Sequence, residues 1–177
     1  MRSVHVVIEG VAPLLFNRMS LKVQENIKSG HTKGRAPTKK EIVDDTDDKL
    51  YQNGQGLYAP AKWLKASLQK GGGLTKNSQW IEGVVFPEEK EILFHKKAPD
   101  GYHEDWVRRP PKTGTLVPTR WPMLKTGWKL TFDWNVTDET FPLAALKQAQ
   151  MASGLRYGIG DGRPEFGRFR VVEFTEK

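Results

Sequence analysis

The sequence GWKLTFDWNVTDETFPLAALKQAQMASGLRYGIGDGRPEFGRFRVVEF, residues 127–174, predicts in order a strand, a helix, a glycine-rich loop and a second strand. Apolar and polar side chains alternate over residues 127–136, which is the period of a half-buried strand, and one face carries Trp128, Leu130, Phe132 and Trp134. The helix is expected over residues 141–154, with Gly154 as its C-cap. FRVVEF, residues 169–174, predicts the last strand.

The first half of the chain adds three strands and one helix to this pattern. Residues 3–10 alternate in the same way as 127–136, with Val4, Val6 and Ile8 on one face and His5, Val7 and Glu9 on the other. PAKWLKASLQKGGG, residues 60–73, predicts a short helix that ends before its three glycines. VVF at 84–86 and EILFHKK at 91–97 are strand-like. We therefore predict an α+β fold in ferredoxin-like or RRM-like βαββαβ order, an antiparallel sheet with two helices on one face.

The 177 residues predict one domain, 1–177, with long basic insertions at about 17–57 and 98–126. Residues 17–40 are polar and basic and predict a loop, within which a short helix at 20–28 fits the pattern. The acidic segment EIVDDTDDK, residues 41–49, is compatible with a helix or with a solvated loop. Residues 106–129 hold six basic residues, four prolines and no acid, and predict an extended arm or a long hairpin.

Composition restricts the classes of partner and site. The net charge of +7 favours a polyanionic partner, because clustered Lys and Arg release counterions from phosphates. The absence of cysteine excludes disulfides, thiolate metal sites and cysteine nucleophiles. No run approaches the roughly 20 apolar residues that span a bilayer, so a cytoplasmic protein without a membrane partner is the expectation. The histidines are scattered, and the aspartates of 44–48 lack the spacing of a calcium loop, so we expect no metal and no cofactor.

The loop between the last helix and the last strand is the strongest functional signal. Glycines let a backbone approach a ligand closely, arginines bind phosphate and aromatic rings stack on bases. A dinucleotide fingerprint is excluded, because GIGDGR follows a helix and precedes a strand, and a P-loop is excluded because its Lys and hydroxyl residue are missing. The structural alternative is a helix C-cap followed by a tight turn. The density of arginine favours a phosphate-binding loop.

Together with the βαββαβ order, two motifs resemble those of the RAMP superfamily. GVAPLLFNR, residues 10–18, follows the first strand, and Gly158-Ile159-Gly160 is a GhG-type element shortly before the last strand. The second half of the loop departs from the family pattern, since it reads Gly167-Arg168-Phe169. The resemblance is to ferredoxin-like RNA-binding proteins of CRISPR complexes, closest to the backbone subunits that coat guide RNA, and to relatives in phages and prophages. It covers residues 3–18 and 127–174 and implies a nucleic-acid-binding protein.

The predicted contacts fall into three groups. Stacking on bases is expected from Trp106, Trp121, Tyr157 and Phe166. Binding to phosphates is expected from Arg18, Lys22, Lys33, Arg35, Arg108, Arg109, Lys112, Arg120, Arg156, Arg163 and Arg168. Close backbone approach is expected at Gly158, Gly160 and Gly162. For the two tryptophans the alternative is that they anchor the arm to the core.

These observations predict a non-enzymatic protein that binds single-stranded DNA or RNA and coats the strand through the loop and the basic arms. The opposite charges of residues 41–49 and of the arms make head-to-tail self-association along the strand conceivable. Two alternatives remain. One is a RAMP-type endoribonuclease, for which His31 or His103 would be the general base. The other is a structural or scaffold subunit of a CRISPR-like or phage complex.

Overall fold

The computed structural model describes residues 1–30, 46–109, 112 and 114–177, and for residues 21–23 and 109 it describes the backbone alone. The largest sheet has the order β10-β1-β9-β5, and every neighbouring pair is antiparallel. Its strands are β1 (Arg2–Gly10), β5 (Val85–Pro87), β9 (Lys129–Val136) and β10 (Phe169–Glu176). The α+β class is confirmed, because antiparallel sheets and separate helices share the chain.

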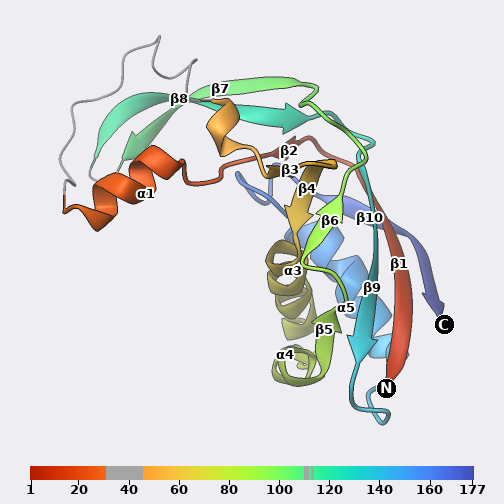
Figure 1. Cartoon of the computed structure of the whole chain (residues 1–177). Helices are drawn as coiled ribbons and strands as arrows, with labels where there is room; N and C mark the ends of the chain where they lie inside the picture. Colours follow the sequence, from red (N-terminus) through yellow and green to blue (C-terminus); the bar gives the residue numbers. More distant parts are fainter. Residues whose placement is uncertain (31–45, 110–111, 113) are drawn as a thin grey trace.

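Two smaller sheets complete the strands of the described residues. The first has the order β2-β8-β7, and its bounds are Leu14–Leu15 for β2, Gly101–Arg109 for β7 and Thr115–Leu124 for β8. The second has the order β3-β4-β6, with β3 at Gln52–Asn53, β4 at Gly56–Pro60 and β6 at Glu91–Leu93. The predicted arm is therefore a hairpin of β7 and β8, which extends away from the largest sheet (Figure 1).

The described helices are α1 (Leu21–Lys28), α3 (Ala61–Gly73), α4 (Ser78–Val84) and α5 (Leu143–Arg156), with a 3-10 turn, η1, at Asp47–Lys49. Helices α3 and α5 pack against each other and lie on one side of the largest sheet (Figure 1). The short helix predicted near residue 20 is α1. Helix α4 was not predicted, because its seven residues carry a single fully buried side chain, Ile81, and so show no helical apolar period.

The core lies between the largest sheet and its helices. Val4, Val6 and Ile8 are completely buried and face these helices, as do the alternating apolar residues of β9, so both predicted faces are confirmed. The indole N–H of Trp134 donates to the Gln150 side chain at 3.0 Å, which satisfies a buried polar pair between β9 and α5. This packing holds α5, and therefore the loop that follows it, against the sheet.

Glycines were expected at the ends of both main helices but lie inside them. Helix α3 continues to Gly73, and α5 continues past Gly154 to Arg156. A Cβ atom on Gly71 would lie 2.1 Å from the Ala149 carbonyl oxygen, and one on Gly154 would lie 2.3 Å from the Phe169 carbonyl oxygen. These glycines let α3 approach α5, and α5 approach β10, more closely than a side chain allows. The predicted helix ends are therefore wrong.

Candidate nucleic-acid interface

The glycine-rich loop, residues 157–168, is held by backbone hydrogen bonds to the segment that follows β1. The Gly167 N–H donates to the Pro13 carbonyl at 2.7 Å, and the Asp161 N–H donates to the Leu15 carbonyl at 3.1 Å. Within the loop, the Ile159 N–H donates to the Gly167 carbonyl at 2.9 Å. The two ends of the chain that resemble the RAMP pattern therefore meet in space.

The close backbone approach expected from the glycines occurs within the chain. A Cβ atom on Gly167 would lie 1.7 Å from the Ile159 carbonyl oxygen, and one on Gly158 would lie 2.6 Å from the Gly167 carbonyl oxygen. Gly160 approaches Leu15 and Gly162 approaches the Phe166 ring in the same way. All four glycines have positive φ angles, from +67° to +80°. Loop folding accounts for the glycines, so their contact with a ligand stays a prediction.

An open hollow of about 450 Å³ lies beside this loop. Three cationic side chains, Lys70, Arg156 and Arg163, line it with Tyr157 and Asp161, and Gly162 and Pro164 complete the lining. The sequence had indicated four of these residues, Arg156, Tyr157, Gly162 and Arg163. Lys70 of α3 was not among the predicted site residues. Lys70 joins the hollow because its neighbour Gly71 lets α3 approach α5, and in the sequence only the run of glycines hinted at this contact.

The described residues offer the three cations of the hollow no salt-bridge partner. Elsewhere in the chain acids bind nearby cations, as in Glu9 with Arg170 at 2.6 Å and Asp100 with Lys96 at 2.7 Å. Among the described residues, none forms a hydrogen bond or ion pair with the side chain of Lys70, Arg156 or Arg163. Three cations gathered beside a single carboxylate repel one another, and the hollow keeps an excess of positive charge. The arrangement is suited to an anionic ligand such as a phosphate group.

The hairpin presents different residues on its two faces. Trp106 pairs with Pro118 and Arg108 pairs with Leu116, so alternation along the strands places Trp106 and Arg108 on one face. Arg120, opposite Glu104, lies on this face too. The Trp106 side chain is 62% exposed, and Arg108 donates to the Gly114 carbonyl at 3.2 Å. An exposed indole with arginines on the same face can stack on a base.

Trp121 lies on the opposite face and is 7% exposed, which contradicts its predicted role in stacking. Its ring lies 5.8 Å from the His103 ring, and the ammonium of Lys49 lies 5.5 Å from its centre. The His103 ring in turn lies 4.8 Å from that of Phe166 in the glycine-rich loop. Trp121 therefore anchors the hairpin, which was the alternative prediction. The neighbours Arg120 and Trp121 cannot act as one stacking and phosphate-binding pair, because strand alternation separates them.

The described part of the acidic segment contacts the hairpin of the same chain. The Tyr102 hydroxyl donates to Asp47 at 2.9 Å, and Lys49 Nζ donates to the Arg120 carbonyl at 2.6 Å. The Arg120 guanidinium lies 4.1 Å from the centre of the Tyr102 ring. The hydrogen bond to Asp47, with burial, raises the pKa of Tyr102. Asp47 is therefore engaged within the chain, which weakens the charge argument for head-to-tail association.

The remaining predicted residues do not join the hollow. Arg18 lines a separate hollow of about 140 Å³ with Asp47 and Asp48, so acids oppose its charge there. Arg168 and Lys112 are exposed, Lys22 belongs to α1 and Arg109 to β7. Lys33 and Arg35, as well as His31, lie outside the described residues. The structure brings together predicted residues at the end of α5 and in the loop, whereas the described predicted residues of the arms do not line the hollow.

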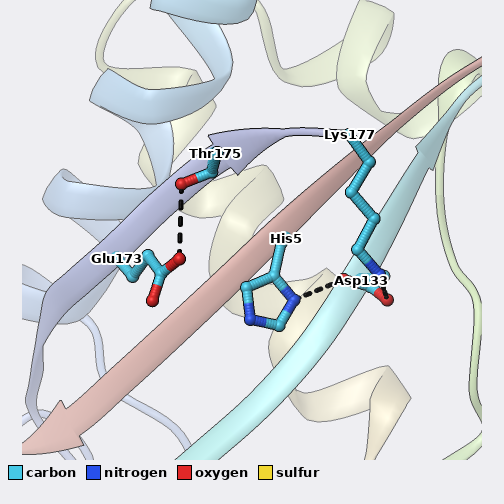
Figure 2. Close-up of polar contacts among 5 residues, drawn as sticks. All are labelled: His5, Asp133, Glu173, Thr175 and Lys177. Atoms are coloured by element: carbon cyan, nitrogen blue, oxygen red, sulfur yellow. Dashed lines mark hydrogen bonds and ion pairs between the residues drawn. The ribbon is translucent and has the colours of Figure 1, made fainter.

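A second polar cluster occupies the face of the largest sheet that carries no helix (Figure 2). His5 Nδ1 lies 2.7 Å from an Asp133 carboxylate oxygen, and Lys177 Nζ lies 2.5 Å from the other oxygen. Burial would raise the pKa of Asp133, but the hydrogen bonds from Lys177 and His5 hold it below its usual value. Beside this cluster the Thr175 hydroxyl donates to Glu173 at 3.4 Å. The sequence had placed His5 on the strand face opposite Val4 and Val6.

In the described residues, no group of three or more His, Asp or Glu side chains is placed to hold a metal ion. No described helix combines the length and the apolar character needed to cross a membrane.

No protein-family model matches the chain, and no curated protein matches it. Among solved structures, it is similar to a chain in the cryo-EM structure of the Type III-B Cmr-beta bound to cognate target RNA, with a TM-score of 0.57 and 12% sequence identity. The similarity covers 99% of this chain and 60% of that chain. At this identity the similarity shows the fold alone. The chain is thus similar in fold to part of a Cmr-beta subunit.

Proposed function

We propose that the protein is a non-enzymatic RNA-binding protein built on a RAMP-type, ferredoxin-like core. In this interpretation β1, α3, β5, β9, α5 and β10 form the βαββαβ core, with α5 leading into the glycine-rich loop. The fold similarity to a chain of an RNA-bound Cmr-beta complex supports the proposal and favours RNA over DNA as the ligand. The insertion predicted at about 98–126 supplies the hairpin of β7 and β8.

The observation that carries the proposal is the hollow beside the loop, where three cations form no ion pair with any described residue. Phosphates of a nucleic acid would bind Lys70, Arg156 and Arg163, and Tyr157 would contact a base. The exposed ring of Trp106 offers a second place to stack, on the hairpin. Stacking on separated aromatic rings needs bases that are free of a duplex, so the ligand is single-stranded.

Fluorescence anisotropy with labelled single-stranded RNA, single-stranded DNA and duplex, at several salt concentrations, tests this proposal. We expect micromolar or tighter binding to single strands and a steep decrease in affinity with salt, because phosphate contacts release counterions. Weaker binding to duplex is expected, since its bases are not free to stack. The absence of binding to all three ligands at low salt would show that the proposal is wrong.

Association of several copies along one strand is part of the proposal. Asp47 is engaged by Tyr102 of the same chain, so we propose that the strand itself gathers the copies. Sedimentation with RNA of increasing length measures this: the number of bound copies should increase with length, and the protein without RNA should stay monomeric. Assembly in the absence of RNA would favour the structural or scaffold alternative.

Endoribonuclease activity is a second candidate function, and the hydrogen bond between His5 and Asp133 is the observation that favours it. The carboxylate holds the proton on Nδ1, which leaves Nε2 of His5 as an acceptor for the 2′-hydroxyl proton of RNA. His103, one of the two predicted bases, instead packs its ring beside Trp121 and Phe166. If the activity exists, structured RNA gives discrete products that H5A loses and H103A retains. No products from the wild-type protein would exclude this function.

A further inference from the structure

We propose that the hollow beside the glycine-rich loop distinguishes RNA from DNA, and that the Asp161 carboxylate does so by accepting a hydrogen bond from a ribose 2′-hydroxyl group. The inference rests on the proposed function, since it assumes that a nucleic acid occupies the hollow. It assigns a role in specificity to Asp161, whose charge is opposite to that of the phosphate-binding residues.

Among the residues that the structure describes, Asp161 is the one acidic residue that lines the hollow. Its backbone N–H donates to the Leu15 carbonyl, and the two residues form an isolated antiparallel bridge. The loop therefore fixes the position of Asp161 through its backbone and leaves the side chain available. In the described part of the chain, no residue forms a hydrogen bond or ion pair with its carboxylate, although three cations line the same hollow.

The presence of a carboxylate in a phosphate-binding hollow requires an explanation, because it repels the phosphates that the cations attract. An ionised carboxylate only accepts hydrogen bonds, so its partner on the ligand must be a donor. In a nucleotide the ribose lies between the phosphate and the base. If the cations bind the phosphate and the Tyr157 ring contacts the base, the sugar is the part of the nucleotide that lies nearest to the Asp161 carboxylate. The 2′-hydroxyl is the sugar donor that RNA has and DNA lacks.

The alternative is that Asp161 only moderates the repulsion between the cations. The two interpretations predict different effects of the carboxylate on the affinities for RNA and for DNA. A carboxylate that only moderates charge weakens RNA and DNA binding equally. A carboxylate that accepts from the 2′-hydroxyl strengthens RNA binding while it weakens DNA binding.

The test compares oligouridylate, oligodeoxyuridylate and 2′-O-methyl oligouridylate of equal length, so that the base is constant. Anisotropy with the full wild-type chain should show about tenfold higher affinity for oligouridylate than for oligodeoxyuridylate. This is the difference expected for one hydrogen bond to a charged acceptor. The 2′-O-methyl form should bind like the deoxy form, because it keeps the sugar shape of RNA but has no donor. In D161A the ribose preference should disappear, while affinity for the deoxy form stays constant or increases.

The matched control is E165A, which removes the same charge from the same loop at an exposed residue outside the hollow lining. It should leave the ribose preference unchanged. Equal changes in RNA and DNA affinity in D161A, or a wild-type protein that binds the 2′-O-methyl form as tightly as RNA, would overturn the inference. Absence of wild-type binding to every oligonucleotide would instead overturn the proposed function.

Discussion

Replacing Lys70, Arg156 and Arg163 together with alanine should lower the affinity for single-stranded RNA about a hundredfold at low salt. This corresponds to roughly 1 kcal/mol for each exposed charge, within the range for solvent-accessible ion pairs. The slope of log affinity against log salt should also decrease by about 2, because three phosphate contacts to a single strand are lost. Anisotropy titrations of wild type and variant at several salt concentrations measure both quantities.

A matched variant separates the hollow from net charge. Lys62, Lys97 and Lys147 are exposed lysines that do not line the hollow, and two of them belong to α3 and α5. Replacing these three with alanine removes the same charge and should reduce affinity only a few-fold. Equal losses in the two triple variants would mean that binding depends on the overall charge of +7 and not on the hollow. Because all six side chains are exposed, the thermal unfolding midpoint should change little in either variant.

Gly167→Ala should destabilise the folded protein by about 4 kcal/mol or more, or prevent folding. The added Cβ atom would lie 1.7 Å from the Ile159 carbonyl oxygen, which is backbone and cannot move without breaking the loop. The residue would also keep a φ angle of +74°, which costs an L-amino acid about 1 to 2 kcal/mol. Changes of this size are exceptional and follow from a few mechanisms, of which overpacking and backbone strain are two. Urea unfolding followed by circular dichroism measures the loss.

Gly127→Ala is the control, since this glycine has a φ angle of +93° but no atom within 4 Å of the added Cβ position. It should cost only the backbone strain, about 1 kcal/mol. Similar free energies of unfolding for the two variants would show that the contact between Gly167 and Ile159 does not determine the loop. If G167A folds but loses its hollow, RNA affinity should fall without any change in surface charge.

The strands that carry the core could be predicted because their signal is local. Val4, Val6 and Ile8, and the alternating residues of 127–136, repeat with the two-residue period of a strand, and a half-buried strand needs no other information. The α+β class followed from the order of these segments. The ends of α3 and α5 could not be predicted, because glycine usually marks the end of a helix. Here Gly71 and Gly154 lie inside the helices, where they allow close contact with residues far along the chain.

The candidate site divides in the same way. Its composition was readable from residues 156–168, since arginines and an aromatic ring beside glycines favour phosphate binding whatever their arrangement. Which of the predicted residues come together in space could not be read from the sequence. Trp106 and Trp121 have similar neighbours in the sequence, but strand register exposes one ring to solvent and buries the other against His103.

The chain order of residue types was thus enough for the strands, the α+β class and the phosphate-binding character of the loop, because each depends on neighbours within a few positions. Folding in three dimensions was needed to bring Lys70 of α3 to Arg156 and Arg163, and to pair Asp47 with Tyr102. These contacts join segments separated by tens of residues. They depend on how closely two helices pack and on which face of a strand a side chain occupies, and neither quantity is encoded in a local pattern.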